Sequence, residues 1–199
     1  MFIGSNNSLT YLKPKNKWWF ENIFHLGRCQ EVDYEIQYML HGVRLFDFKL
    51  FVDCNSHIIV KNGTYEYSMF SFYEILDYLN KKGDTIVLIT LDSPYWYYTR
   101  NMIKTVEDKF KETCRIIESI YENIGFCGGY GYYDYKPLYK FSWLNTHEMP
   151  ILVEPYGFSR LYRFVTKWCP MFIRKLNKKY IKQFENQNVY LMLNYVNKR

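Results

Sequence analysis

Residues 85–92 have the sequence Thr-Ile-Val-Leu-Ile-Thr-Leu-Asp, an aliphatic and β-branched run that ends on a carboxylate. A short apolar run of this kind predicts a strand buried on both faces, as parallel strands between helices are. Apolar residues recur at helical spacing before and after it, over residues 70–79 and 101–123. Because a helix is predicted on each side of a buried strand, the sequence indicates the α/β class.

The alternation of strands and helices continues in both directions along the chain. The Gly- and Tyr-rich residues 125–135 are predicted to form a loop. Repeated strand–helix–strand connections imply parallel strands, either in a closed (β/α) barrel or in an open doubly wound sheet. Since about six strands are predicted and a complete barrel has eight, either two strands are hidden in the tyrosine-rich region or the barrel is incomplete. Besides residues 85–91, the predicted strands are residues 2–3, 43–50, 57–60, 150–153 and 189–193, and further helices are predicted at residues 31–40 and between the last two strands.

Composition indicates one domain over residues 1–199, because no linker or internal repeat divides the chain. No G-x-G-x-x-G motif follows the first strand and no P-loop occurs, which disfavours a nucleotide-binding sheet. Alanine is absent, whereas Lys, Asn, Ile, Tyr and Phe abound. This bias is typical of an AT-rich coding sequence, so we expect the source to be a large DNA virus or a protist.

The cysteines and the apolar runs indicate where the protein resides. Five cysteines are scattered without a Cys-x-x-Cys pair, which predicts neither a disulfide framework nor a zinc site and favours a reducing compartment. The first residues lack the features of a signal peptide, and no apolar run approaches the roughly 20 residues of a membrane span. We expect a cytoplasmic or virion protein that is neither secreted nor membrane-spanning.

The net charge of +6 is modest and concentrated near residues 174–182. Such a charge permits contact with anionic membranes or nucleic acid. The cations lie on a predicted amphipathic helix, so a solvated helix face is the simpler interpretation. We therefore expect no nucleic-acid partner.

Three segments in order carry a resemblance to a known family. They are Gly4-Ser5-Asn6-Asn7-Ser8, the stretch Gly42-Val43-Arg44-Leu45-Phe46-Asp47-Phe48-Lys49, and Val60-Lys61-Asn62-Gly63-Thr64-Tyr65, the last followed by a helix and the strand that ends at Asp92. Together they resemble the X region of phosphatidylinositol-specific phospholipases C over about residues 2 to 92. The resemblance implies a TIM-type (β/α) barrel of the phospholipase C-like phosphodiesterase kind.

The family's reaction needs two histidines, and the resemblance puts asparagines in their place. One histidine accepts the proton of the inositol 2-hydroxyl and the other protonates the leaving glycerol oxygen, because imidazole titrates near neutrality. The matching positions here are Asn6 and Asn62. A carboxamide cannot take or give that proton, although it can hydrogen-bond a phosphate. Activity near background is therefore expected.

The cation position is also altered relative to the family's calcium-dependent members. Asn7, Asp47 and Asp92 match its calcium-binding places, but Lys49 replaces one carboxylate. An ammonium group repels calcium and can stand in for it beside a phosphate. The resemblance therefore implies no cofactor, with Asp47, Lys49 and Asp92 at the catalytic positions and Asn7, Arg44 and Lys49 as phosphate or head-group ligands.

The leading hypothesis is a catalytically impaired phospholipase C-like protein that acts as a binding or structural module. Its expected partners are a phosphoinositide, an anionic membrane surface or other virion proteins. One alternative is an active phosphodiesterase that uses a displaced base, either His25 or Asp92. Another is an unrelated α/β domain in which the motif match is accidental. The aromatic stretch Pro94–Tyr98 follows a strand at the expected active end, where it either caps the core or presents rings to a lipid or protein.

Overall fold

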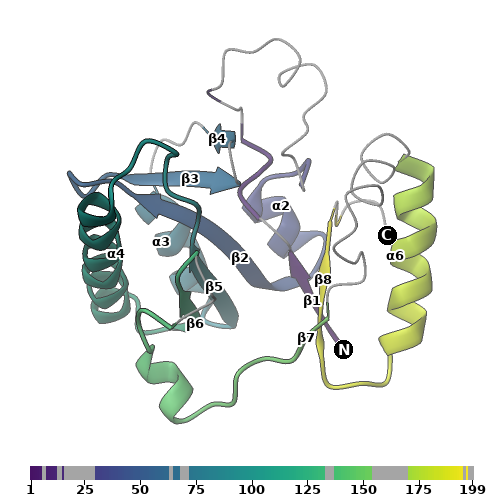
Figure 1. Ribbon diagram of the computed structural model, residues 1–199. Coiled ribbons are helices and arrows are strands. Elements are labelled where there is room, and N and C mark those ends of the chain that lie inside the picture. The colour runs from purple at the N-terminus through teal and green to yellow at the C-terminus, as the bar shows by residue number, and fades with distance from the viewer. Residues whose placement is uncertain are drawn as a thin grey trace.

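The computed structural model describes residues 1–5, 8–12, 15, 30–62, 65–67, 72–132, 137–153, 170–194 and 196. Its α/β class agrees with the sequence prediction: helices pack on a mostly parallel sheet of eight strands (Figure 1). The elements are β1 (Phe2–Ser5), α2 (Tyr34–Met39), β2 (Val43–Val52), β3 (Ile58–Asn62), β4 (Tyr65–Tyr67), α3 (Phe72–Lys82), β5 (Thr85–Leu91), α4 (Arg100–Ile120), β6 (Ile124–Tyr130), the 3-10 helix η1 (Ser142–Asn145), β7 (Leu152–Val153), α6 (Pro170–Phe184) and β8 (Tyr190–Leu193).

Strand β2 organises the sheet. Along one edge it pairs in parallel with β5, which in turn pairs with β6. Along the other edge it pairs first with β1 and then, past Phe46, with the antiparallel hairpin β3–β4. β8 and β7 continue the parallel sheet beyond β1. The six parallel strands are therefore ordered β6-β5-β2-β1-β8-β7.

The antiparallel direction of β3 differs from the parallel strands that a (β/α) barrel implies. Only residues 53–57 separate β2 from β3, whereas a parallel crossover needs about a dozen residues. Asp53 closes this short hairpin: its Oδ1 accepts hydrogen bonds from the backbone N–H groups of Asn55 and His57, each at 2.8 Å. The length of the connection thus fixes the direction of the strand.

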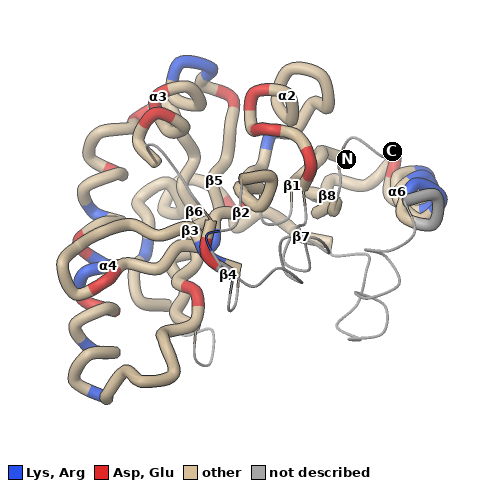
Figure 2. Tube along the Cα trace, turned by 90° about the horizontal axis from the view of Figure 1, so that it is seen from above, with Lys and Arg blue, Asp and Glu red and all other residues tan. Residues whose placement is uncertain are grey.

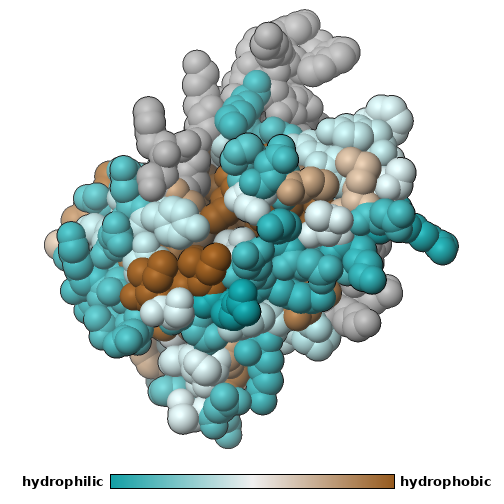
Figure 3. Space-filling model, turned by 90° about the vertical axis from the view of Figure 1, so that its left-hand side faces the viewer, coloured by the Kyte–Doolittle hydropathy of each residue, from teal (hydrophilic) through white to brown (hydrophobic). Residues whose placement is uncertain are grey.

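The two faces of the sheet bury different side chains. Phe46, Phe48 and Ile89 pack in the main core with the buried faces of α3 and α4. Leu45 and Leu88, which point the other way, form a second cluster with Cys127 and Met192, covered by Trp143 of η1. The side of the molecule that carries α4 is mostly hydrophilic, with one compact hydrophobic area (Figure 3). The central strands β2 and β5 are therefore buried on both faces, as their apolar sequences predict.

The strand β6 shows that the predicted loop over residues 125–135 is wrong for its first part. Its backbone pairs with β5 from Ile124 to Gly128, after which the register shifts. Gly128 and Gly129 have φ of +90° and +75°, a conformation that glycine adopts at bulges. One of the hidden strands is therefore present, with Ile124 as its only β-branched residue.

Among the described residues between β6 and β7, no α-helix returns the chain across the sheet. Instead, residues 137–141 fold back beside β6, where Phe141 stacks on Phe126 with ring centroids 5.6 Å apart. The Tyr139 hydroxyl donates to the Glu118 carboxylate of α4 at 2.6 Å. No strand pairing joins β6 to β7 among the residues that the structure describes.

Candidate functional site

Acidic and basic side chains meet where β2 and β5 approach their carboxyl ends. In the register of the sheet, Asp47 lies beside Leu88 and Lys49 beside Thr90. Because side chains alternate along a strand, Asp47 and Lys49 share the face of Leu45, opposite the main core. The Asp47 side chain is buried. Burial of the neighbouring Cys127 thiol raises its pKa to about 12, and the negative charge of Asp47 contributes to that increase. Cys127 therefore stays protonated and offers no nucleophile here.

Asp92 extends the same group of side chains just beyond β5. Its backbone N–H donates to the carbonyl of Leu50 at 2.7 Å, which continues the pairing with β2. The Asp92 carboxylate accepts a hydrogen bond from the backbone N–H of Ser93, and Asp92 is buried. The carboxylates of Asp47 and Asp92 thus belong to one end of the sheet, where ligand sites of parallel α/β sheets occur.

A buried polar network fixes both ends of the loop that follows β1. The Ser8 backbone N–H donates to the Asp47 carbonyl at 2.8 Å, and the Asp47 N–H donates back to Ser8 Oγ at 2.9 Å. Ser8 Oγ also donates to the Ser5 carbonyl at 2.8 Å. Gln37 of α2 joins the loop as well, since its Nε2 donates to the Ser8 carbonyl at 2.9 Å. The predicted site residues Asn6 and Asn7 lie between Ser5 and Ser8 and outside the described residues.

Asn62 ends β3 on the side of the sheet where β1 also ends. β1 and β3 occupy the same edge of β2, with Ser5 beside Phe46 and Val60 beside Leu50. Since β1 runs with β2 and β3 runs against it, their carboxyl ends approach each other along residues 46–50 of β2. Asn62 is therefore brought to the same end of the sheet as Asp47, Lys49 and Asp92.

Arg44 is not brought to this group. It lies near the amino end of β2, where its Nε is 2.8 Å from Asp84 Oδ2. Its guanidinium also lies over the Tyr38 ring, 4.1 Å from the centroid. These contacts tie β2 to α2 and to the end of α3, so Arg44 holds a structural position in this arrangement.

Lys61 is a residue at this end that the sequence analysis does not single out. It is only 3% exposed, and its Nζ donates to the Ser93 carbonyl at 2.7 Å. The ammonium group also lies 4.3 Å from the ring centroid of Tyr95 and 4.9 Å from that of Phe51. Burial lowers the pKa of Lys61, and the charges of Asp92 and Glu66 oppose that shift. A lysine inside the apolar strand Ile-Ile-Val-Lys was the available sequence signal.

The aromatic turn after β5 combines the two roles that the sequence left open. Tyr95 and Tyr98 cap the core, where both rings contact Phe51 at centroid distances of 5.0 and 5.7 Å. The Tyr95 hydroxyl donates to Glu66, and burial together with this bond raises its pKa. Trp96 is 94% exposed, and Tyr97 is also exposed. The turn thus presents two rings to solvent from a base of buried tyrosines.

Of the histidines in the described residues, two lie at the amino ends of parallel strands and one lies in a hairpin. His41 and His147 precede β2 and β7, at the amino ends of parallel strands. His57 is in the β2–β3 hairpin, where its Nδ1 is 3.0 Å from Asp53 Oδ2 and its side chain is 72% exposed. His25 lies outside the described residues.

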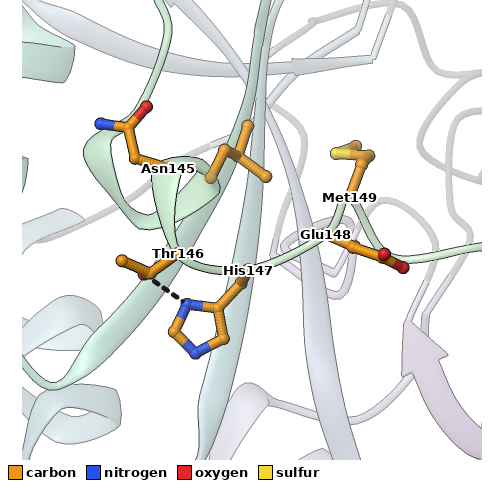
Figure 4. A pocket seen from close by; sticks show the side chains of 6 residues that line it. Asn145, Thr146, His147, Glu148 and Met149 are labelled. Carbon is orange, nitrogen blue, oxygen red and sulfur yellow. Dashed lines mark hydrogen bonds between the residues drawn. The ribbon is translucent and has the colours of Figure 1, made fainter.

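One shallow pocket lies at the amino-end side of the sheet. Its lining is the continuous stretch Leu144–Met149 around His147, next to η1 (Figure 4). The His147 ring stacks on Trp143 with centroids 4.4 Å apart, and its Nδ1 is 2.9 Å from Thr146 Oγ1. These contacts hold the ring in a local turn, away from the carboxylates and lysines at the other end.

The described residues contain neither a cluster of metal ligands nor a membrane-spanning helix. In the described part of the chain, no three His, Cys, Asp or Glu side chains are grouped closely enough to hold a metal ion. None of the helices in that part is both long and apolar enough to cross a bilayer. In comparisons with known proteins, the sequence matches neither a family model nor a curated protein.

Proposed function

We propose that this chain is a catalytically impaired phospholipase C-like module that binds a phosphorylated head group at the carboxyl ends of an incomplete TIM-type barrel. The single observation that carries the proposal is the gathering of Asp47, Lys49, Asn62 and Asp92 at one end of the parallel sheet. In (β/α) barrels this end carries the active site.

The order of the parallel strands supports the barrel. Each parallel strand neighbours the next one in the chain from β1 through β2 and β5 to β6, and β7 and β8 lead back to β1. A doubly wound sheet reverses its strand order at a switch point, whereas a barrel keeps it. Two further β/α units between β6 and β7 would close the ring.

The charges at this end suit an anionic head group better than a metal ion. Lys49 faces the same side as Asp47, and the ammonium group of Lys61 lies close by beneath the aromatic turn. A positive charge stabilises a phosphate without metal. Asn62 provides a hydrogen-bonding amide where the family's chemistry needs an acid or base. The arrangement therefore favours binding over turnover.

The head-group proposal predicts weakened binding when Lys49 loses its charge. Replacing Lys49 with Gln is expected to weaken the binding of a soluble inositol phosphate about 10-fold or more, because a hydrogen bond to a charged group contributes about 1.5–3 kcal/mol. Isothermal titration calorimetry measures the effect. Lys104→Gln on the exposed face of α4 is the matched control and should bind like the wild type. Equal losses in both variants, or no binding by the wild type, would contradict the proposal.

The proposal of impaired catalysis makes a separate prediction, which the active-enzyme alternative contradicts. The wild-type chain is expected to release inositol phosphate from phosphatidylinositol vesicles at a rate indistinguishable from that without protein, because general acid–base catalysis contributes about 10²–10⁴-fold. Turnover that is measurable and is abolished by His25→Ala or Asp92→Asn would favour the displaced base instead.

A further inference from the structure

Helix α6 exposes a stripe of cations on one face. Its apolar residues Ile173 and Leu176 are buried, and the buried Asn177 donates to the Asn194 carbonyl at 3.2 Å. These contacts fix which face of the helix points outward. The basic residues lie together on one side of the helix at the edge of the molecule (Figure 2). The exposed cations, here called the α6 stripe, are Arg174, Lys175, Lys178, Lys179 and Lys182.

Helix α4 provides an internal comparison. It also has five basic residues over Arg100–Ile120, but four acidic residues are interleaved with them. Lys109 pairs with Glu112 at 3.1 Å and Lys111 pairs with Asp108 at 2.9 Å. No acidic residue occurs within α6. The cations of α4 thus have acidic partners within their own helix, whereas those of α6 do not.

The stripe accounts for most of the net charge of the protein. The chain has 26 basic and 20 acidic residues. Without the five cations of the stripe, 21 basic residues would almost balance those 20 acidic residues. A charge that is concentrated on one face creates a local field for an anionic partner, which an evenly spread charge does not.

The chemistry of the stripe favours a polyphosphate backbone over a bilayer. A helix that binds a membrane interface inserts its apolar face, but the apolar face of α6 is buried in the protein. About 1 kcal/mol per basic residue at an anionic surface gives only about 5 kcal/mol for the stripe, and stable anchoring needs a second signal. Phosphate contacts alone supply the sequence-independent binding of nucleic acid.

The dimensions also fit duplex DNA. From residue 174 to residue 182 the stripe is about 12 Å long, at about 1.5 Å per residue. Duplex DNA carries one charge per about 1.7 Å of its axis with both strands counted, so a length equal to that of the stripe carries about seven phosphates on its two strands. The major groove of B-form DNA admits a helix, whereas that of A-form RNA is deep and narrow.

We propose that the α6 stripe binds the phosphate backbone of double-stranded DNA without sequence preference. This inference replaces the expectation of no nucleic-acid partner, because that expectation treated the stripe as an ordinary solvated face. The inference does not depend on the head-group site, because that site lies on β2, β3 and β5 and not on α6.

The test is a salt titration of binding to a fluorescein-labelled duplex, followed by fluorescence anisotropy. Five phosphate contacts predict a slope of about −4.5 for log K against log salt concentration, which is about a 500-fold loss of affinity between 50 and 200 mM. In Lys178→Gln/Lys182→Gln the slope is expected to fall to about −2.7. The control Lys104→Gln/Lys111→Gln removes the same charge from α4 and should keep the wild-type slope.

The remaining outcomes decide against the proposal. Absence of duplex binding by the wild type would overturn the proposal. An equal loss of duplex affinity in the two double variants would also overturn it, because net charge alone would then explain the binding. Sedimentation of the wild type with phosphatidylserine-containing vesicles, without duplex binding, would assign the stripe to a membrane. Circular dichroism spectroscopy checks that each variant is folded, so that a loss of binding is not caused by unfolding.

Discussion

Replacing Asn6 and Asn62 together by histidine is expected to raise the rate of phosphatidylinositol cleavage at least about 10²-fold over the wild-type chain, since each acid or base contributes about 10²–10⁴-fold. The physical reason is that imidazole titrates near pH 7 and a carboxamide does not. Asn62 ends β3 at the end of the sheet that holds Asp47 and Lys49. Release of inositol phosphate from vesicles measures the gain, and two titrating histidines predict a bell-shaped dependence on pH.

Controls separate the position of the histidines from their number. Asn55→His/Asn145→His adds two imidazoles at exposed positions and is expected to stay at the wild-type rate. Each single variant should gain less than the double variant, because the reaction needs both a base and an acid. If the double variant binds inositol phosphate but shows no gain, the two positions do not flank the scissile bond. If binding is absent as well, the head-group proposal itself is wrong.

Strand β5 shows what the sequence could predict and why. The predicted strand over residues 85–91 agrees with β5 (Thr85–Leu91), because its β-branched residues are favoured in a strand covered on both faces. The basic helix α6 and the strand β8 follow the same logic of apolar periodicity. Where local pattern and tertiary environment agree, a single sequence is sufficient.

Strand β6 and Lys61 show where local pattern was insufficient. In β6 the sequence Gly-Phe-Cys-Gly-Gly-Tyr has few β-branched residues, and its pairing depends on β5 beside it. The burial of Lys61 depends on Tyr95 and on the Ser93 carbonyl, both more than thirty residues away. Such partners become neighbours only through the fold, so the sequence could not identify them. The candidate site residues come instead from motif spacing, which depends on residue order along the chain and not on these long-range contacts.

Replacing Gly129 with Ala is expected to destabilise the protein by about 4 kcal/mol, at the high end of single substitutions. Gly129 has φ of +75°, which costs a residue with a side chain about 1–3 kcal/mol. An added Cβ would also lie 2.1 Å from the Tyr139 carbonyl oxygen. That atom is backbone and cannot rotate away, and it belongs to the segment whose Leu138 and Tyr139 N–H groups donate to the Gly129 carbonyl. The midpoint of urea-induced unfolding measures the change.

Gly42→Ala is the matched control, because it isolates the backbone conformation from the steric contact. Gly42 also has a positive φ, of +58°, but no atom lies within 4 Å of the position that its Cβ would take. A loss of about 1 kcal/mol is expected there. The difference of about 3 kcal/mol between the two variants is therefore the contribution of the close approach between β6 and residue 139. Equal losses of stability in the two variants would mean that β6 can shift to accept a methyl group. The contact with Tyr139 would then not fix the position of this end of β6.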